Sequence, residues 1–203
     1  MADKKYFRCD LSQVKATNRG GRLHSAQFNA ELPNGVLGYL GDFVSGSTEI
    51  RNFLAPTAEL IKAKLPVIVM KPEINYKQDR ATDNAIGIFR NPANKAFPAV
   101  PLEEFDGIDL SSDYFDLTGK ASGKTKETEV GDKFVLQANT VAGTQLKYSE
   151  TAPLITDACF YFEVVDVVNS HIANYVYTDG SATATMFPQP YKMVKLALVR
   201  VEQ

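Results

Sequence analysis

Several features that mark common protein classes are scarce in this sequence. It has no tryptophan and only two cysteines, Cys9 and Cys159, among 203 residues. A single pair so far apart is not a disulfide framework, and no Cys-x-x-Cys or Cys/His spacing of a zinc site occurs. We therefore expect two separate thiols, with Cys159 a small core residue on a strand.

An excess of one charge and long apolar runs are missing as well. The 22 basic residues nearly balance the 24 acidic ones, so the chain lacks the basic stripe that nucleic-acid binding requires. The longest apolar stretches, such as residues 65–70, have the length of a strand and not of a membrane span. The basic N-terminus is followed by no apolar core, unlike a signal peptide. The sequence predicts no nucleic-acid partner, no membrane segment and a protein kept in a cytoplasm or assembled there.

What the sequence does contain is a series of short strand patterns. The clearest is at residues 192–201, where Val194, Leu196 and Leu198 alternate with less apolar positions, the period of a β-strand. Residues 159–165 are apolar on both faces, which predicts a central strand. One segment, residues 56–64, has a helix pattern with proline at the first helical position and lysines in the last turn. The other expected strands are residues 36–44, 49–53, 67–71, 85–90, 107–117, 133–138, 145–148, 158–168 and 175–178.

These patterns predict an all-β fold: a small barrel or sandwich of short antiparallel strands with one short helix. Residues 1–35 are interpreted as a flexible polar arm, and residues 36–203 as a single β-rich domain. Docking the arm's few apolar side chains would contribute several kcal/mol, about the same as ordering its backbone costs. We therefore expect the arm to be fixed only in an assembly. Its apolar residues are Leu11, Val14, Leu23, Phe28 and Leu32.

Residues 118–131 form the second segment with little apolar anchoring, and we expect a mobile loop there. Part of it, residues 119–125 (GKASGKT), is similar to a phosphate-binding loop. That motif needs four residues between its glycines, and three separate Gly119 from Gly123. The residues that follow do not begin a helix whose N-terminus would bind the anion. The pattern favours a surface loop.

The acidic residues between positions 103 and 116 could supply oxygen ligands to calcium. They lack the spacing of an EF-hand, and on a strand Asp109 and Asp113 share one face while Asp116 lies on the other. We expect a solvated strand face with a turn at Asp106-Gly107. The run consists of Glu103, Glu104, Asp106, Asp109, Asp113 and Asp116.

No catalytic motif emerges from the remaining polar residues. The only histidines are His24 and His171. Ser170 precedes His171, but neighbours on a strand point to opposite faces, and neither a G-x-S-x-G elbow nor an H-E-x-x-H pair occurs. Paired carboxylates such as Glu73 and Asp79, or Asp79 and Asp83, are typical surface charges. The sequence predicts no catalytic residue, no metal and no cofactor.

Aromatic residues near the C-terminus give the candidate interaction surface. Four of them lie in a stretch rich in glycine and proline, and exposed aromatics there would contact sugar or protein. Alternatively, they cover one end of the barrel. Together with two apolar residues of the arm, the candidate surface comprises Tyr175, Tyr177, Phe187, Tyr191, Leu11 and Phe28.

Three short segments resemble small auxiliary head proteins of tailed bacteriophages. They are residues 65–76 (LPVIVMKPEINY), 94–97 (NKAF) and 101–106 (PLEEFD). In those proteins a PE-x-x-Y segment precedes a segment of the type GK-A-x-A-x-x-LEEGD. The resemblance covers about residues 36–117, with a weaker likeness in the final strand. Asn94 stands where glycine is expected, and the arm and the loop at 118–131 lengthen this chain.

The resemblance implies a virion protein without enzymatic activity that decorates and stabilises the capsid. Its partners would be the major capsid protein or other virion proteins, and it would be homo-oligomeric or bound to the lattice. Two other functions stay open. One is a carbohydrate- or receptor-binding module that uses Tyr175, Tyr177 and Tyr191 as stacking platforms. The other is an enzyme on a β scaffold.

Overall fold

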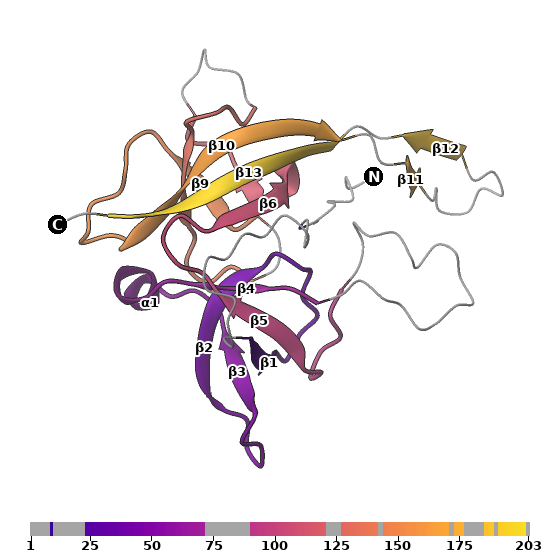
Figure 1. The fold of residues 1–203 in the computed structure, drawn as a ribbon, viewed down its shortest axis with the longest axis vertical. Helices are drawn as coiled ribbons and strands as arrows, with labels where there is room; N and C mark the ends of the chain where they lie inside the picture. The colour runs from indigo at the N-terminus through magenta and orange to yellow at the C-terminus, as the bar shows by residue number, and fades with distance from the viewer. Residues whose placement is uncertain are drawn as a thin grey trace.

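The structure is a computed structural model that describes Cys9 and residues 23–71, 90–120, 127–141, 144–170, 173–176, 185–188 and 191–201, with residues 169–170, 173–176, 185–188 and 191 as backbone only. It contains a closed five-stranded barrel, a six-stranded sheet and a two-stranded ribbon (Figure 1). The all-β prediction is confirmed, and one short α-helix is present among the described residues. No helix in these ranges is long and apolar enough to cross a membrane.

The barrel is closed by strand pairing around its whole circumference. Its strands follow the order β1-β3-β2-β4-β5, and β5 pairs back onto β1. The pairing of β1 with β3 is parallel, and the other pairings are antiparallel. Full closure leaves no free sheet edge. The strands are β1 (His24–Gln27), β2 (Leu37–Phe43), β3 (Ile50–Leu54), β4 (Val67–Val69) and β5 (Phe97–Pro101).

Aromatic rings fill the barrel. Phe53 packs edge-on against Phe28 and Phe97, with ring centroids 6.0 and 5.6 Å apart. Beside this cluster, β2 and β3 come so close at Gly38 that a Cβ atom there would lie 2.6 Å from the Leu54 carbonyl oxygen. Only glycine fits this position, because any side chain would push the two strands apart.

The predicted boundary between arm and domain near residue 35 needs correction. The strand β1 lies within residues 1–35 and is paired on both sides, and Ala26 and Leu32 are fully buried. Cys9 is buried as well and forms an isolated β-bridge with Leu110. The sequence of β1, HSAQ, does not alternate between apolar and polar residues. Hydrophobic periodicity therefore could not predict a strand at this position. The remainder of the predicted arm, residues 1–8 and 10–22, lies outside the described residues.

The six-stranded sheet has the order β6-β13-β10-β8-β9-β7. Its edge strands β6 and β7 are consecutive in the chain, and only the three residues of a 3-10 helix, Ser112–Tyr114, join them. Three residues of 3-10 helix span roughly 6 Å, so the sheet must curl until its edges nearly meet at this end. The strands are β6 (Gly107–Ser111), β7 (Phe115–Asp116), β8 (Lys133–Leu136), β9 (Leu146–Ser149), β10 (Phe160–Ser170) and β13 (Tyr191–Arg200).

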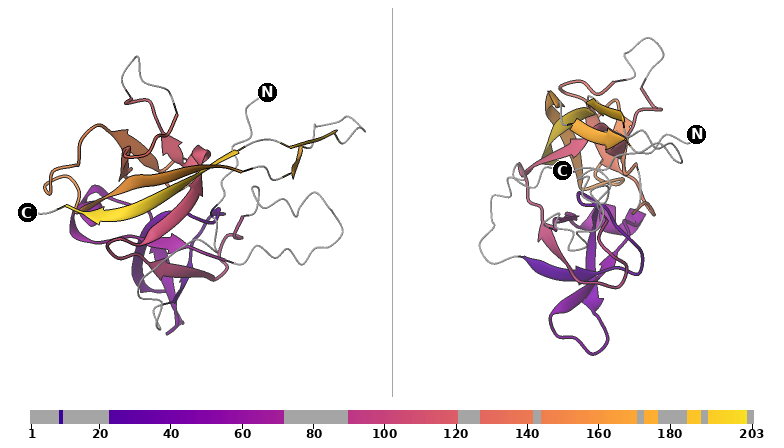
Figure 2. Two further views of the ribbon diagram at one scale, coloured as in Figure 1. Left: turned by 45° about the horizontal axis from the view of Figure 1, so that its top comes forward. Right: turned by 90° about the vertical axis from the view of Figure 1, so that its right-hand side faces the viewer.

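Buried polar side chains join the barrel to the curled sheet, which lie side by side in Figure 2. The Gln145 amide accepts a hydrogen bond from the Leu37 N–H at 2.8 Å and donates one to the Leu37 carbonyl at 3.0 Å. The Tyr114 hydroxyl donates to the carbonyl of Asn34. Helix α1 (Ala58–Ala63) adds a contact, because the Ile61 carbonyl accepts from the N–H of Cys159. The two parts share one hydrophobic core.

The clearest strand predictions are confirmed. Val194, Leu196 and Leu198 are fully buried, and β10 is an internal strand of the sheet. The helix begins at Ala58, with Thr57 and not Pro56 at its start, because the Thr57 hydroxyl accepts from the Leu60 N–H at 3.3 Å. The expected strand at 107–117 is interrupted by the 3-10 helix, and that at 85–90 lies outside the described residues except for Arg90.

Candidate interaction surface

A long two-stranded ribbon extends from the curled sheet. In the pairing of β10 with β13, Ser170 lies opposite Tyr191. In the pairing of β11 (Ala173–Val176) with β12 (Thr185–Pro188), Ala173 lies opposite Pro188. Ala173 follows Ser170 by three residues, and Pro188 precedes Tyr191 by three residues. The register is therefore the same, and β11 and β12 continue the hairpin of β10 and β13. Figure 1 shows this ribbon reaching away from the sheet.

The outer part of the ribbon has no described strand beside it. The pairing of β8 with β10 stops at Glu163, and the pairing of β6 with β13 stops at Met193. Val164 still exchanges backbone hydrogen bonds with Gly131 and Asp132, and beyond Val164 and Met193 each strand pairs only with the other within the described part of the chain. Backbone groups along such edges are free to add a strand of a neighbouring molecule.

Three of the predicted surface residues fall on this ribbon. Tyr175, Phe187 and Tyr191 lie in β11, β12 and β13, whereas Tyr177 lies outside the described residues. Tyr175 is paired with Met186, and Phe187 with Asn174. Because successive positions of a strand alternate between faces, Tyr175 and Phe187 stand at positions on opposite faces of the ribbon. The structure brings these residues onto one element but does not place them on one face.

The two arm residues of the candidate surface have separate outcomes. Leu11 lies outside the described residues. Phe28 is partly buried and packs against the core through Phe53, so its part in an interaction surface stays a prediction.

Two valines on β10 are exposed where the ribbon leaves the sheet. Val165 is 54% exposed and Val168 is 46% exposed. The register of β10 against β13 shifts between Val164 and Asp166, so Val165 is the extra residue of a β-bulge. A bulge bends its strand and turns side chains away from the regular alternation. The run at 159–165, apolar on both faces, predicted a central strand, and the bulge explains why Val165 is nevertheless exposed.

The tight turn at residues 103–106 presents the most exposed large apolar side chain among the described residues. Phe105 is 73% exposed and has a φ of 64°. A residue with a Cβ atom pays about 1–2 kcal/mol to adopt this left-handed conformation. The turn is nevertheless well fixed. The Phe105 N–H donates to the Leu198 carbonyl at 2.7 Å, and the Leu198 N–H donates to the Asp106 carbonyl at 3.1 Å.

The acidic run around this turn is not a single solvated face. Asp106 and Asp109 are buried, contrary to the expectation, and the Asp106 carboxylate accepts from the Glu103 N–H at 2.7 Å. Asp116 accepts from the hydroxyl and the N–H of Thr118, and these hydrogen bonds lower the pKa of the Asp116 carboxyl. The carboxylates of Asp106 and Asp116 thus have local structural roles. Within the described ranges no three His, Cys, Asp or Glu side chains group so as to hold a metal ion.

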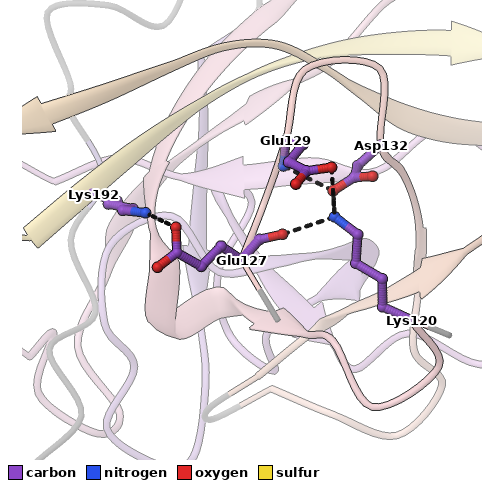
Figure 3. A network of polar contacts seen from close by, with 5 residues as sticks. All are labelled: Lys120, Glu127, Glu129, Asp132 and Lys192. Carbon is purple, nitrogen blue, oxygen red and sulfur yellow. Dashed lines mark hydrogen bonds and ion pairs between the residues drawn. The ribbon is translucent and has the colours of Figure 1, made fainter. Parts of the chain in front are cut away.

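A buried lysine fixes both ends of the loop at 118–131. The Lys120 ammonium lies 2.7 Å from the Asp132 carboxylate, 2.8 Å from the Glu127 carbonyl and 3.4 Å from the Glu129 carboxylate (Figure 3). It also lies 5.6 Å from the centroid of the Tyr148 ring. An ion pair between Glu127 and Lys192 of β13 adds a second link to the sheet. Lys120 is therefore buried although it belongs to the segment expected to be a mobile surface loop.

This network decides against a phosphate-binding role for Lys120. A phosphate-binding loop presents its lysine to the ligand, whereas the Lys120 ammonium is enclosed by the loop's own carboxylates and carbonyl. Desolvation alone would lower the pKa of Lys120, but the hydrogen bond and charge of Asp132, together with Glu129, raise it above the ordinary value. Lys120 is therefore held as a cation. Residues 121–126, which include Gly123 and Lys124, lie outside the described residues.

Burial holds two described side chains that carry potentially reactive atoms, Cys159 and Tyr39, in their protonated forms. Both cysteines are free, as expected, but Cys159 is half-buried and precedes β10 instead of lying on a strand. Burial raises the pKa of its thiol and leaves it protonated, the poorly nucleophilic form. Burial likewise raises the pKa of Tyr39, whose hydroxyl has no hydrogen-bond partner among the residues that the structure describes. His24 lies on β1, and His171, Glu73, Asp79 and Asp83 lie outside the described residues.

No protein-family model matches the chain, and no curated protein or solved structure matches it either.

Proposed function

We propose that the chain is an auxiliary structural protein of a tailed-bacteriophage head, which binds the capsid and stabilises it. The proposal starts from the three segments that resemble such proteins, at residues 65–76, 94–97 and 101–106. The partner would be the major capsid protein, repeated on the lattice. Repetition lets each single contact be weak while the assembled shell gains much stability.

The observation that carries the proposal concerns backbone conformation at two of these segments. In the resembled pattern, glycine occupies the positions that Asn94 and Phe105 occupy here. Both residues have a positive φ, 57° and 64°. Glycine adopts such a conformation without steric cost, so the backbone has the shape for which the pattern uses glycine. This agreement between a sequence pattern and an independent property of the fold supports the resemblance.

The architecture is compatible with a role in an assembly. A closed barrel joined to a curled sheet gives a compact body, and the ribbon of β10–β13 and β11–β12 offers two strand edges beyond it. A strand edge can pair with an extended segment of a neighbour through backbone hydrogen bonds. The exposed Val165 and Val168 lie at the start of this ribbon.

The proposal is tested by mixing the purified chain with expanded heads that lack it. We expect saturable binding at a fixed ratio of this chain to the major capsid protein, and a higher temperature of head disruption after binding. Binding that never saturates, or no binding to any head, would remove the proposal.

A ribbon-shortened variant serves as the matched comparison. Replacing residues 171–190 by Asn-Gly keeps the Ser170–Tyr191 pair and closes it with a two-residue hairpin turn. This variant should fold with an unchanged body, because the ladder from Phe160 to Ser170 remains. We expect it to bind heads more weakly than the full chain, and equal binding would assign the contact to the body.

A further inference from the structure

We propose that Phe105 is the apolar anchor by which this chain docks into a pocket on its protein partner, a pocket lined by apolar side chains and rimmed by cationic ones. The inference rests on the proposed function for the identity of the partner, the major capsid protein. It names the residue that makes the contact and the chemistry of the surface that receives it.

The first argument is that the fold gains nothing from phenylalanine at this position. Three described residues other than glycine have a positive φ: Asn94, Phe105 and Asn139. Asparagine tolerates this conformation because its short polar side chain bonds locally, whereas an aromatic residue does not. The ring of Phe105 is also 73% exposed, so packing does not compensate for the strained backbone. Strained backbone conformations cluster at functional sites such as ligand clamps.

The second argument is that the turn is built to hold this ring still. The Asp106 carboxylate accepts from the Glu103 N–H at 2.7 Å, and the Asp106 N–H donates to the Glu103 carbonyl at 3.1 Å. The backbone N–H of Phe105 is bound to Leu198 of β13, next to the fully buried core of the sheet. A side chain presented on a rigid turn loses little conformational freedom on binding, which favours its use as an anchor.

The third argument gives the chemistry of the partner. Glu103 and Glu104 flank Phe105 within the same turn and are only partly buried, so the ring is accompanied by negative charge. An apolar pocket with a rim of lysine or arginine complements the Phe105 ring and these two glutamates.

The test separates binding from stability. Phe105→Asn and Phe105→Gly both suit the left-handed backbone, so the purified variants should melt at the same temperature as the parent chain or slightly above it. Binding to heads that lack the protein should weaken by about thirtyfold or more, the typical effect of removing an interface anchor. Phe105→Leu, which keeps an apolar side chain, should retain most of the binding.

Phe43→Thr provides the matched control. Phe43 is an exposed phenylalanine, 48% accessible, at the end of β2 in the barrel, and its loss should leave head binding unchanged. Equal binding by the parent chain and Phe105→Asn overturns the anchor while leaving the proposed function in place. A clear drop in the melting temperature of Phe105→Asn shows that the ring supports the fold and also overturns it. If the parent chain binds no head, the proposed function fails, and the stated partner fails with it.

Discussion

The barrel and the curled sheet differ in how completely strand pairing closes them. Each must bury one face of a small β-structure, and the barrel does so by pairing β5 back onto β1, so that backbone hydrogen bonds complete the ring. In the described part of the chain the sheet has no such closing pair, and three residues of 3-10 helix bridge its edges instead. The barrel therefore depends on every strand, whereas the sheet can extend β10 and β13 into a ribbon. The closed barrel is thus a rigid body, whereas the incompletely closed sheet has strands that extend beyond it and can contact a partner.

The largest test of this comparison is the removal of residues 2–30. The deletion takes away β1 and Cys9, which separates β3 from β5 and exposes Phe53 and Phe97. We expect the variant to lose most of the 5–15 kcal/mol of unfolding free energy typical of a domain. Thermal and urea unfolding followed by circular dichroism would measure the loss. Removing only residues 2–8 keeps β1 and Cys9 and is the control. A truncated chain that melts like its parent would show that the barrel does not need closure.

The second test concerns the loop that the sheet carries. Lys120→Met leaves Asp132, whose side chain is 10% exposed, without its cation. Breaking a buried ion pair from one side costs about 3–5 kcal/mol, and the exposure of Glu129 moves the expected loss to the lower end of that range. Lys95→Met, at an exposed turn next to the barrel, should change stability by less than about 0.5 kcal/mol. Equal stability of the two variants would mean that the network contributes nothing.

The same network predicts a pH dependence with a definite sign. The pKa of Lys120 is raised in the folded chain above the ordinary 10.5, so folding favours the charged lysine. Its contribution is fully present below the ordinary value and is lost as the pH rises through the higher folded value. The stability difference between the parent chain and Lys120→Met should stay constant from about pH 7 to 10 and shrink in more alkaline solution. A difference that grows above pH 10.5 would contradict the assignment.

The junction between the two parts is tested by Gln145→Leu. The substitution keeps the side-chain volume but leaves the N–H and carbonyl of Leu37 without their partner in a buried site. Each unsatisfied buried group costs about 1–3 kcal/mol, so we expect a loss of roughly 2–4 kcal/mol in urea unfolding. Gln137→Leu, which removes only one long hydrogen bond to Asp116 at 3.4 Å, is the control. Separate unfolding transitions for the barrel and the sheet would show that this junction alone couples them.

The smallest expected effect is at the helix that links β3 to β4. Thr57→Ala removes the N-cap hydroxyl that accepts from the Leu60 N–H. Such substitutions cost about 1 kcal/mol. Because Ile61 of this helix bonds to Cys159 beside the sheet, a fraying helix should also speed hydrogen exchange at the Cys159 amide. Thr57→Ser, which keeps the cap, should preserve both stability and exchange rates.

Local pattern alone determined several elements of this protein. The alternation of Val194, Leu196 and Leu198 was enough to predict β13, since one face of that strand is fully buried. The run at 159–165 predicted the internal strand β10 because it is apolar on both faces. Proline before residues 58–63 and lysines at their end predicted the helix. In each case the residue types encode the structure within one short window.

Only the tertiary structure decided the rest. The polar strand β1 and the proline-containing strand β5, with Pro98 and Pro101, carry no alternating pattern, and they are strands because distant partners pair with them. Lys120 is buried because Glu127, Glu129 and Asp132 return to it around the loop. Phe105 is exposed because backbone hydrogen bonds between its turn and Leu198 fix the turn in this orientation. Pairing and burial between segments far apart in the chain depend on where the whole fold places them, and no short window of sequence contains that information.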